Sequence, residues 1–339
     1  MTKLRWTVMT EESSTLESLL QLVRDMSSGR PANLRKGDQR DGSVYAPTPE
    51  IRTAVQVALI TGRPLLLSGP PGCGKSSLAS FVARSLGFSY FEFVVTDDSD
   101  PQDLLWRIDL IRRLNDAQLA KLTDDESVFT DYLEPGPLWW ALNPETAERR
   151  GADSALTRPA APPVHLLDYE ATRAGAVLLI DEIDKADSSF CNGLLVPLGS
   201  RQFYVPEIND TVTNGPGRIE ESPLVIITTN NERDLPEAFV RRCVVLPVPG
   251  PDANRLKEIA RLHFPVLDTD EGLMSRVAKL APRFEFDANG HAHASTAEFL
   301  DLVEVLIKLN TDFDSPEWQL IEKLVVEKPI MRRNAFSQW

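Results

Sequence analysis

A glycine-rich loop is the first stretch of this sequence whose residue types suggest chemistry. It has the spacing G-x-x-x-x-G-K-S, begins at Gly69 and ends at Lys75 and Ser76, between an apolar run and a run with helical spacing. Glycines let successive backbone N–H groups approach an anion, and the N-terminus of the following helix adds a positive dipole end. The pattern predicts a loop that binds nucleotide phosphates. The predicted binding residues are Gly69, Pro70, Pro71, Gly72, Cys73, Gly74, Lys75, Ser76 and Ser77.

Two carboxylates further along the chain complement this loop. Asp181 and Glu182 follow the apolar run of "VLLIDEID". A carboxylate at the carboxyl end of a parallel strand faces the ligand crevice of an α/β sheet. We expect Lys75 to reach the terminal phosphates, and Ser76 and Asp181 to hold Mg²⁺. Glu182 is expected to orient the attacking water as general base.

The elements that must position these residues alternate along the chain. Apolar or β-branched runs at 65–68, 88–95, 176–184 and 224–231 predict strands, and segments with helical spacing lie between them. This alternation predicts an α/β fold with a parallel sheet that helices cover on both faces. From about residue 252 the pattern is helical only, which predicts a small C-terminal α-helical lid. The expected division is an N-terminal extension and linker at 1–44, a nucleotide-binding domain at 45–250, and the lid with a C-terminal tail at 251–339.

Composition narrows the range of partners. The 339 residues carry 36 basic and 50 acidic side chains, a net charge of −14, which disfavours nucleic acid and anionic membranes as partners. The three cysteines lie far apart, as is typical of a reducing compartment. No signal-peptide core and no run of about 18 apolar residues is evident. We therefore expect a cytoplasmic protein without a membrane segment.

Five segments together resemble one protein family. In chain order they are "LLLSGPPGCGKS", "GPLWWAL", "AVLLIDEIDKAD", "IITTNN" and "LPEAFVRRC". Over about residues 45–310 the chain resembles the AAA+ ATPases, and within them the MoxR-like family. The resemblance implies hydrolysis of ATP with Mg²⁺. It also implies that Asn230 contacts the γ-phosphate or the attacking water.

The same resemblance implies a site shared between subunits. The arginine finger, which acts on the nucleotide of a neighbouring subunit, matches Arg242, with Arg241 as the alternative. A permanent charge and a planar fork suit arginine to this task. Relatives often carry a further arginine at the start of a lid helix, where this chain has Ala297. Either another arginine substitutes or that contact with the γ-phosphate is missing.

Partners also follow from the resemblance. It implies a homo-oligomeric, hexameric ring that remodels or assembles a protein client, with a von Willebrand factor A domain protein as a possible partner. Segment 97–134, with eleven acidic and four basic residues, and a hairpin at 201–223 around the "NGPG" turn match insertions that contact the client in relatives.

Two other classes of function stay open. One is a nucleotide-dependent switch or scaffold in a multi-gene defence or signalling system, in which ATP gates assembly. The other is a motor that acts on DNA or RNA, which the acidic insertion disfavours because nucleic acids repel it.

Overall fold

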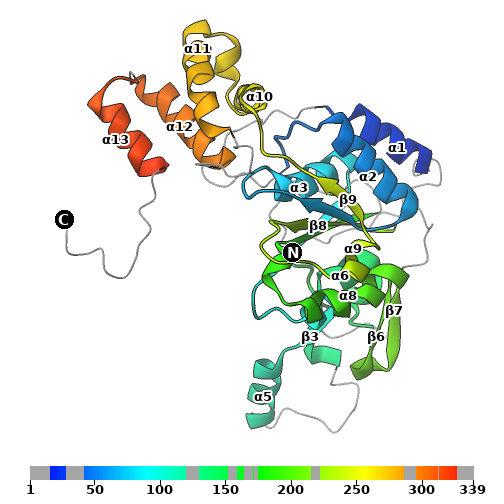
Figure 1. The fold of residues 1–339 in the computed structure, drawn as a ribbon. Helices are drawn as coiled ribbons and strands as arrows, with labels where there is room; N and C mark the ends of the chain where they lie inside the picture. The colour runs from blue at the N-terminus through cyan, green and yellow to red at the C-terminus, as the bar shows by residue number, and fades with distance from the viewer. Residues whose placement is uncertain are drawn as a thin grey trace.

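The computed structural model describes most of the chain. The described residues are 16–27, 42–119, 130–151, 159–163, 171, 175–214, 222–285, 295–311 and 313–326. Figure 1 shows a sheet-containing body, with a group of helices from the C-terminal part of the chain beside it.

A five-stranded sheet lies at the centre of the body. Its strands are β1 (Leu65–Ser68), β2 (Ser89–Val94), β5 (Ala176–Asp181), β8 (Leu224–Thr229) and β9 (Val244–Pro247). They are ordered β2-β5-β8-β1-β9 and every neighbouring pair is parallel. Leu65 of β1 pairs with Ile226 on one side and with Val244 on the other. All five carboxyl ends therefore meet at one edge.

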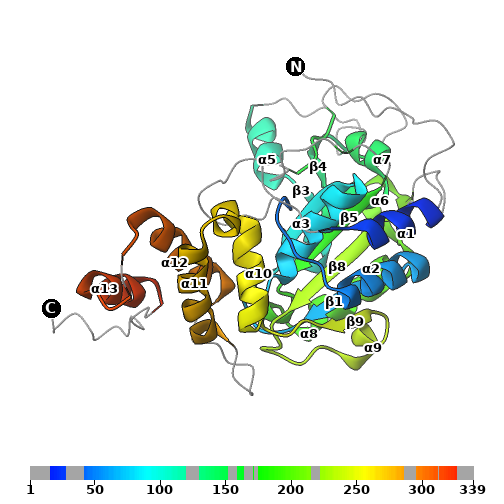
Figure 2. The same ribbon diagram turned by 90° about the horizontal axis from the view of Figure 1, so that it is seen from above.

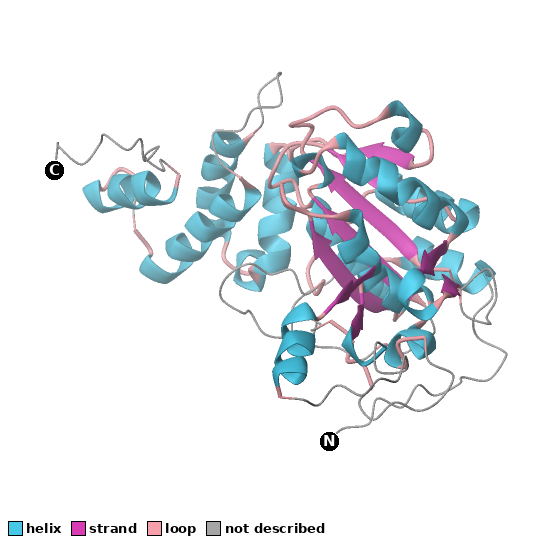
Figure 3. Ribbon diagram, turned by 90° about the horizontal axis from the view of Figure 1, so that it is seen from below, coloured by secondary structure: helices cyan, strands magenta, loops and turns pink. Residues whose placement is uncertain are grey.

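Helices cover both faces of the sheet (Figures 2 and 3). Side chains alternate between the faces because the side-chain period of a strand is two residues. Leu65 and Leu67 are buried in one apolar cluster, and Leu66 belongs to the other. The predicted parallel sheet with helices on both faces is confirmed. One cluster includes residues of α1 (Leu16–Asp25), α2 (Pro49–Thr61) and α3 (Lys75–Leu86), and the other those of α4 (Pro101–Leu105), α6 (Pro137–Leu142), α7 (Pro144–Glu148), α8 (Ser188–Ser200) and α9 (Glu237–Val240).

The acidic segment packs on the core through its two ends and also carries a projecting helix. Its described part contains α4, then β3 (Trp106–Ile108), which pairs antiparallel with β4 (Leu133–Pro135). Between these strands lies α5 (Leu110–Gln118), which has no buried residue and projects from the body in Figure 1. The remainder of the segment, 120–129, lies outside the described residues.

The predicted hairpin is present, but its turn lies earlier in the chain than the sequence predicts. Strand β6 (Gln202–Val205) pairs antiparallel with β7 (Asp210–Thr213), and the short 3₁₀ turn η3 (Pro206–Ile208) connects them. The "NGPG" sequence begins at Asn214, after β7 has ended. The structure turns earlier because Pro206 fits the first position of a 3₁₀ turn and Asn209 adopts a left-handed conformation, with φ of 50°.

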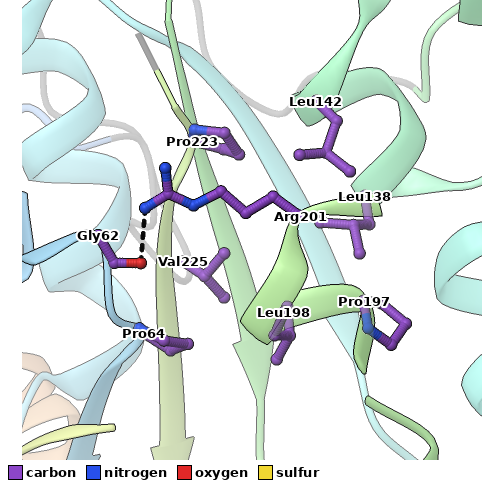
Figure 4. A pocket seen from close by; sticks show the side chains of 9 residues that line it. All are labelled: Gly62, Pro64, Leu138, Leu142, Pro197, Leu198, Arg201, Pro223 and Val225. Carbon is purple, nitrogen blue, oxygen red and sulfur yellow. Dashed lines mark hydrogen bonds between the residues drawn. The ribbon is translucent and has the colours of Figure 1, made fainter. Parts of the chain in front are cut away.

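Arg201 fixes the junction between helix α8 and this hairpin. Its guanidinium donates to the backbone oxygen of Gly62 over 2.7 Å and also hydrogen-bonds to Ser222. Figure 4 shows this side chain among the apolar and proline side chains with which it lines a cavity of about 10 Å³. Burial lowers the pKa of Arg201. The hydrogen bonds compensate for part of that desolvation.

The C-terminal helices have an apolar cluster of their own. They are α10 (Ala253–His263), α11 (Glu271–Leu280), α12 (Thr296–Leu309) and α13 (Pro316–Val325), with 3₁₀ turns at η5 (Pro265–Asp268) and η6 (Ala281–Phe284). Phe299 and Trp318 are fully buried in this cluster. Leu262 also packs against Val44 and Ala46, which precede α2. The division into domains stays a prediction. Among the described residues, no helix combines the length and apolarity needed to cross a bilayer.

The separate clusters generate a prediction about stability. Phe299→Ala should destabilise the helical group by about 3–5 kcal/mol, because it removes a buried aromatic side chain and leaves a cavity. Hydrogen exchange should then accelerate in α12 much more than in β8. Equal acceleration in both elements would show that the two clusters unfold as one unit.

Candidate nucleotide-binding site

Lys75 lies at the centre of the site. It is the first residue of α3 and is only 6% exposed. Its Nζ donates to the backbone oxygens of Gly69 and Pro70, each over 2.8 Å, and to Oδ1 of Asn230 over 2.9 Å. The ammonium is therefore held in the concave side of the loop by neutral acceptors. A phosphate group, which is charged, would be a stronger acceptor than these.

Ser76 and Asp181 place a hydroxyl oxygen and a carboxylate oxygen side by side. The Ser76 hydroxyl donates to Asp181 Oδ1 over 2.7 Å, and Thr228 donates to the same oxygen over 2.6 Å. Thr228 also accepts the backbone N–H of Glu182 over 2.8 Å, so β8 fixes the end of β5. A hydroxyl beside a carboxylate fits Mg²⁺, which uses one or two protein oxygens and fills its other positions with water and phosphate. No group of three or more His, Cys, Asp or Glu that could hold a metal occurs in the described part of the chain.

Glu182 has an unusual backbone conformation for its residue type. Its φ is +58°, in the left-handed region, which costs a non-glycine residue of order 1–3 kcal/mol. The conformation comes directly after β5, where the strand gives way to the 3₁₀ turn η2 (Ile183–Lys185). Asn230 Nδ2 lies 3.4 Å from Glu182 Oε1. The expected general base and the expected γ-phosphate contact are thus neighbours.

Asp184 holds the loop that carries Asn230. It is 1% exposed, and its Oδ2 accepts the backbone N–H groups of Asn230 over 3.0 Å and of Glu232 over 2.8 Å. Its other oxygen, Oδ1, has no hydrogen-bond partner among the described residues. Two charge-assisted bonds from one carboxylate oxygen fix the start of the loop after β8.

Gly72 in the loop allows close approach of helix α12. Gly72 has φ of +76°, and a Cβ there would lie 2.6 Å from Cβ of Ser295, which caps α12. The helical group therefore touches the phosphate-binding loop directly. Ala297 lies in the first turn of α12 and is exposed. Between the glycines, burial raises the pKa of the Cys73 thiol, which keeps it protonated at neutral pH.

The two arginines are not part of this assembly of side chains. Arg241 and Arg242 follow α9 and precede β9, at the amino edge of the sheet. Ser68, at the start of the loop, pairs with Pro247, five residues after Arg242. At about 3.3 Å per residue, on the order of 15 Å separates the arginine from the loop. Arg242 instead donates to the backbone oxygen of Ala238 over 2.9 Å, and Arg241 pairs with Glu237.

Comparisons with known proteins agree with this fold. A family described as "AAA domain (dynein-related subfamily)" matches residues 64–243, more than half of the chain. The chain belongs to this family. Members of the AAA+ class bind nucleotide, typically with Mg²⁺, and commonly form oligomeric rings.

The individual proteins that this chain resembles have low sequence identity to it. Midasin of Giardia intestinalis is 26% identical over an alignment of 207 residues, and the match covers 58% of this chain but only 3% of midasin. The RuvB Holliday junction branch migration motor of Thermotoga maritima is 16% identical, covering 87% of this chain and 72% of that chain with a TM-score of 0.42. A putative ATPase from Cytophaga hutchinsonii is 15% identical, covering 86% and 63% with a TM-score of 0.38. At this level of similarity, neither structure indicates a substrate or partner for this chain.

Sequence reasoning missed several residues that support the site. The apolar pattern of "LVIITT" predicts only a strand for Thr228, although a hydroxyl in it is a weak signal of a buried polar contact. The sequence pattern predicts no role for Lys185 and Arg233. Their contacts join turns that are 48 residues apart in the chain. No local pattern reveals such a contact.

Lys75→Ala tests the binding role of the loop. Nucleotide affinity should fall roughly 10- to 150-fold, because hydrogen bonds to a charged group are worth about 1.5–3 kcal/mol. Titration with a fluorescent ATP analogue measures the change, and far-UV circular dichroism verifies folding. Lys308→Ala, which removes an exposed lysine paired with Glu304 on α12, is the matched control and should bind normally. Equal affinity in Lys75→Ala and wild type would contradict the assignment.

Proposed function

We propose that this chain is an ATPase that hydrolyses ATP at the carboxyl edge of its sheet. The convergence of Lys75, Ser76, Asp181, Glu182 and Asn230 at one edge, from β1, β5 and β8 and the segments that follow them, carries the proposal. Residues 69–77 bind the phosphates, and Ser76 and Asp181 supply oxygen ligands for Mg²⁺.

Glu182 is the general base in this proposal. It accepts a proton from water as the water oxygen bonds to the γ-phosphorus and the bond to the departing ADP breaks. Asn230 orients the water or a γ-phosphate oxygen with its amide, and Lys75 neutralises charge on the terminal phosphates. The 3.4 Å contact between Asn230 and Glu182 supports a shared task.

The distant arginines support a ring of like subunits. Arg241 and Arg242 border a cavity of about 810 Å³ at the amino edge, together with the end of α2 and residues of α8. Arg242 cannot reach its own phosphate-binding loop in this structure, but a neighbouring copy could present its loop to this edge. We propose a homo-oligomeric, hexameric ring in which Arg242, or else Arg241, acts on the nucleotide of the neighbour.

The client is proposed to be a protein. Helix α5 of the acidic insertion projects from the body, and the β6–β7 hairpin lies beside the insertion, where Phe203 stacks on Trp106. The acidic charge disfavours nucleic acid. The MoxR-like resemblance further suggests remodelling or assembly of that client, with a von Willebrand factor A domain protein as partner.

A nucleotide-gated switch is the second candidate. The methyl group of Ala297, two residues after the Ser295 that packs on Gly72, supplies no charge to a phosphate. Unless another arginine replaces this cation, the site is expected to turn over slowly, which suits a switch better than a motor. The ATP turnover number with and without the partner separates the two: strong stimulation favours the motor.

Glu182→Gln tests the proposed base. The amide keeps the shape but does not accept the proton, so hydrolysis should fall by roughly 10²–10⁴-fold. ATP affinity should stay close to that of wild type, and ATP-bound protein should accumulate, as measured by quenched-flow and filter binding. Retention of wild-type turnover would move the role to another carboxylate, Asp184 being the next candidate.

Mixing two inactive variants tests the shared site. Arg242→Ala and Lys75→Ala should each be nearly inactive, since an arginine finger is worth about 10³–10⁵ in rate in related chemistry. In mixed rings, the intact loop of an Arg242→Ala subunit can meet the intact finger of a Lys75→Ala subunit, so activity should partly return. Native mass spectrometry verifies mixed rings. No recovery in such rings would argue that Arg242 does not act in trans, and Arg241 would be tested next.

A further inference from the structure

Arg63 contacts both arginines of the proposed shared site, and no role above accounts for it. It lies between the end of α2 and the start of β1, in the segment that leads into the phosphate-binding loop. Its Nε donates to the backbone oxygen of Arg242 over 3.1 Å, and its Nη2 donates to the backbone oxygen of Arg241. One guanidinium thus bridges two successive backbone oxygens. An inference about this contact rests on the proposed action of Arg242 on a neighbouring subunit.

The pairing of β1 with β9 brings these residues together, although Arg63 and Arg241 are 178 positions apart in the chain. Leu65 pairs with Val244, and the N–H of Val244 donates to the backbone oxygen of Pro64 over 2.8 Å. The hydrogen-bonded ladder between the two strands therefore continues to the residue next to Arg63. The sheet itself places Arg63 beside the end of α9.

A second anchor fixes the chain on the other side of Arg63. Gly62 ends α2 in a left-handed conformation, with φ of 62°, and its backbone oxygen accepts a hydrogen bond from Arg201 over 2.7 Å. A Cβ at this position would lie 1.6 Å from Nη2 of Arg201, so only glycine fits beside that guanidinium. Arg63 is therefore held between an anchored glycine and the first residues of a central strand.

The contact with Arg63 completes the hydrogen bonding of the turn that follows α9. The N–H groups of Arg241 and Arg242 already donate to backbone oxygens of α9, each over 3.0 Å. Their own backbone oxygens accept from Arg63. The planar fork of arginine suits two acceptors and is preorganised, so little side-chain entropy is lost for each hydrogen bond. Donors and acceptors of this turn are thus both fixed, which sets where the two arginine side chains leave the body.

The three arginines share one exposed surface. All of them line the cavity of about 810 Å³ at the amino edge, and each is exposed. The phosphate-binding loop of the same chain is remote from this surface. Gly69 follows Arg63 by six residues, and at about 3.3 Å per residue the intervening strand separates them by on the order of 15–20 Å. Arg63 makes no hydrogen bond to that loop within the described residues.

We propose that Arg63 is a positioning residue for the shared site: it fixes the backbone of Arg241 and Arg242 so that Arg242 reaches the nucleotide of the neighbouring subunit. Arg63 itself touches no nucleotide. It acts on the site of the neighbour, although it lies just before the phosphate-binding loop of its own chain.

Removal of the guanidinium tests this role. Arg63→Met keeps an unbranched apolar chain and removes the donors, so kcat should fall about three- to tenfold, the equilibrium change that one net hydrogen bond supports. ATP affinity and KM should stay within about twofold of wild type. Arg283→Met, which removes an exposed arginine paired with Glu322, is the matched control and should leave both constants unchanged. Circular dichroism and thermal denaturation verify folding.

A conservative variant separates geometry from charge. Arg63→Lys keeps the charge, but one ammonium cannot span both oxygens in the way of a planar fork, so its kcat should stay below about half of the wild-type value. This variant carries the test if Arg63→Met does not fold. Wild-type kcat in Arg63→Lys would overturn the proposed bridge. A fall of about 100-fold or more in Arg63→Met would show that Arg63 contacts the nucleotide directly.

Mixed rings locate the effect in the neighbouring site. When excess Lys75→Ala protein is added, the intact loop of an Arg63→Met subunit meets the intact arginines of its neighbour. Turnover per Arg63→Met subunit should therefore rise. The double variant Lys75→Ala/Arg63→Met differs only in lacking Arg63 beside those arginines, and it should produce no rise. Equal effects of the two added proteins would overturn the positioning role.

The mixture of Arg242→Ala with Lys75→Ala distinguishes failure of this inference from failure of the proposed function. If that mixture recovers activity while the two added proteins of the Arg63 test act alike, only the role of Arg63 is overturned. If that mixture stays inactive in verified mixed rings, the trans action of Arg242 is overturned, and the role of Arg63 falls with it. Absence of hydrolysis in every protein would overturn the ATPase itself.

Discussion

The parallel pairing of β5, β8 and β1 is the constraint on which the site depends. Because these strands run in one direction and in register, the residues that follow them reach the same edge. Two hydrogen bonds then connect the segments that end there: Thr228 of β8 donates to Asp181 of β5, and Lys75 of α3 donates to Asn230, which follows β8. A slip of one residue would turn every side chain of a strand to the opposite face and separate these groups.

Burial of charge is the cost of this arrangement. Lys75, Asp181 and Asp184 are at most 6% exposed, and an isolated buried charge is strongly unfavourable. Backbone oxygens, hydroxyls and backbone N–H groups compensate each of them. Most of these partners are neutral, so a ligand that brings phosphates can exchange weaker contacts for charge-assisted ones. The site is therefore preorganised and can also respond to its ligand.

The two edges of the sheet carry different parts of the proposed active site: one binds the subunit's own nucleotide, and the other presents arginines to the nucleotide of a neighbouring subunit. The loop and the carboxylates lie at the carboxyl edge, while Arg241 and Arg242 follow α9 at the amino edge. Helix α12 touches the loop at Gly72, and Arg233 connects the turn after β5 to the acidic segment. Each of these contacts joins the site to another part of the chain.

The sequence by itself determined the strand–loop–helix at residues 65–86, the carboxylates at the end of β5 and the α/β class, because these follow from local spacing and apolar periodicity. It located the hairpin but not its turn. Asn-Gly is a general turn signal, and the chain already turns at Pro206, before it reaches Asn214. Only the tertiary structure decided that Thr228 hydrogen-bonds to both Asp181 and Glu182. It also decided that Asp184 holds the loop of Asn230. Lys185 pairs with Glu182, and Arg233 donates to the backbone oxygen of Lys185. The physical reason is strand order: β5 and β8 are neighbours in space, but 42 residues lie between Asp181 and Leu224. Local pattern carries no information about which distant strand completes a site.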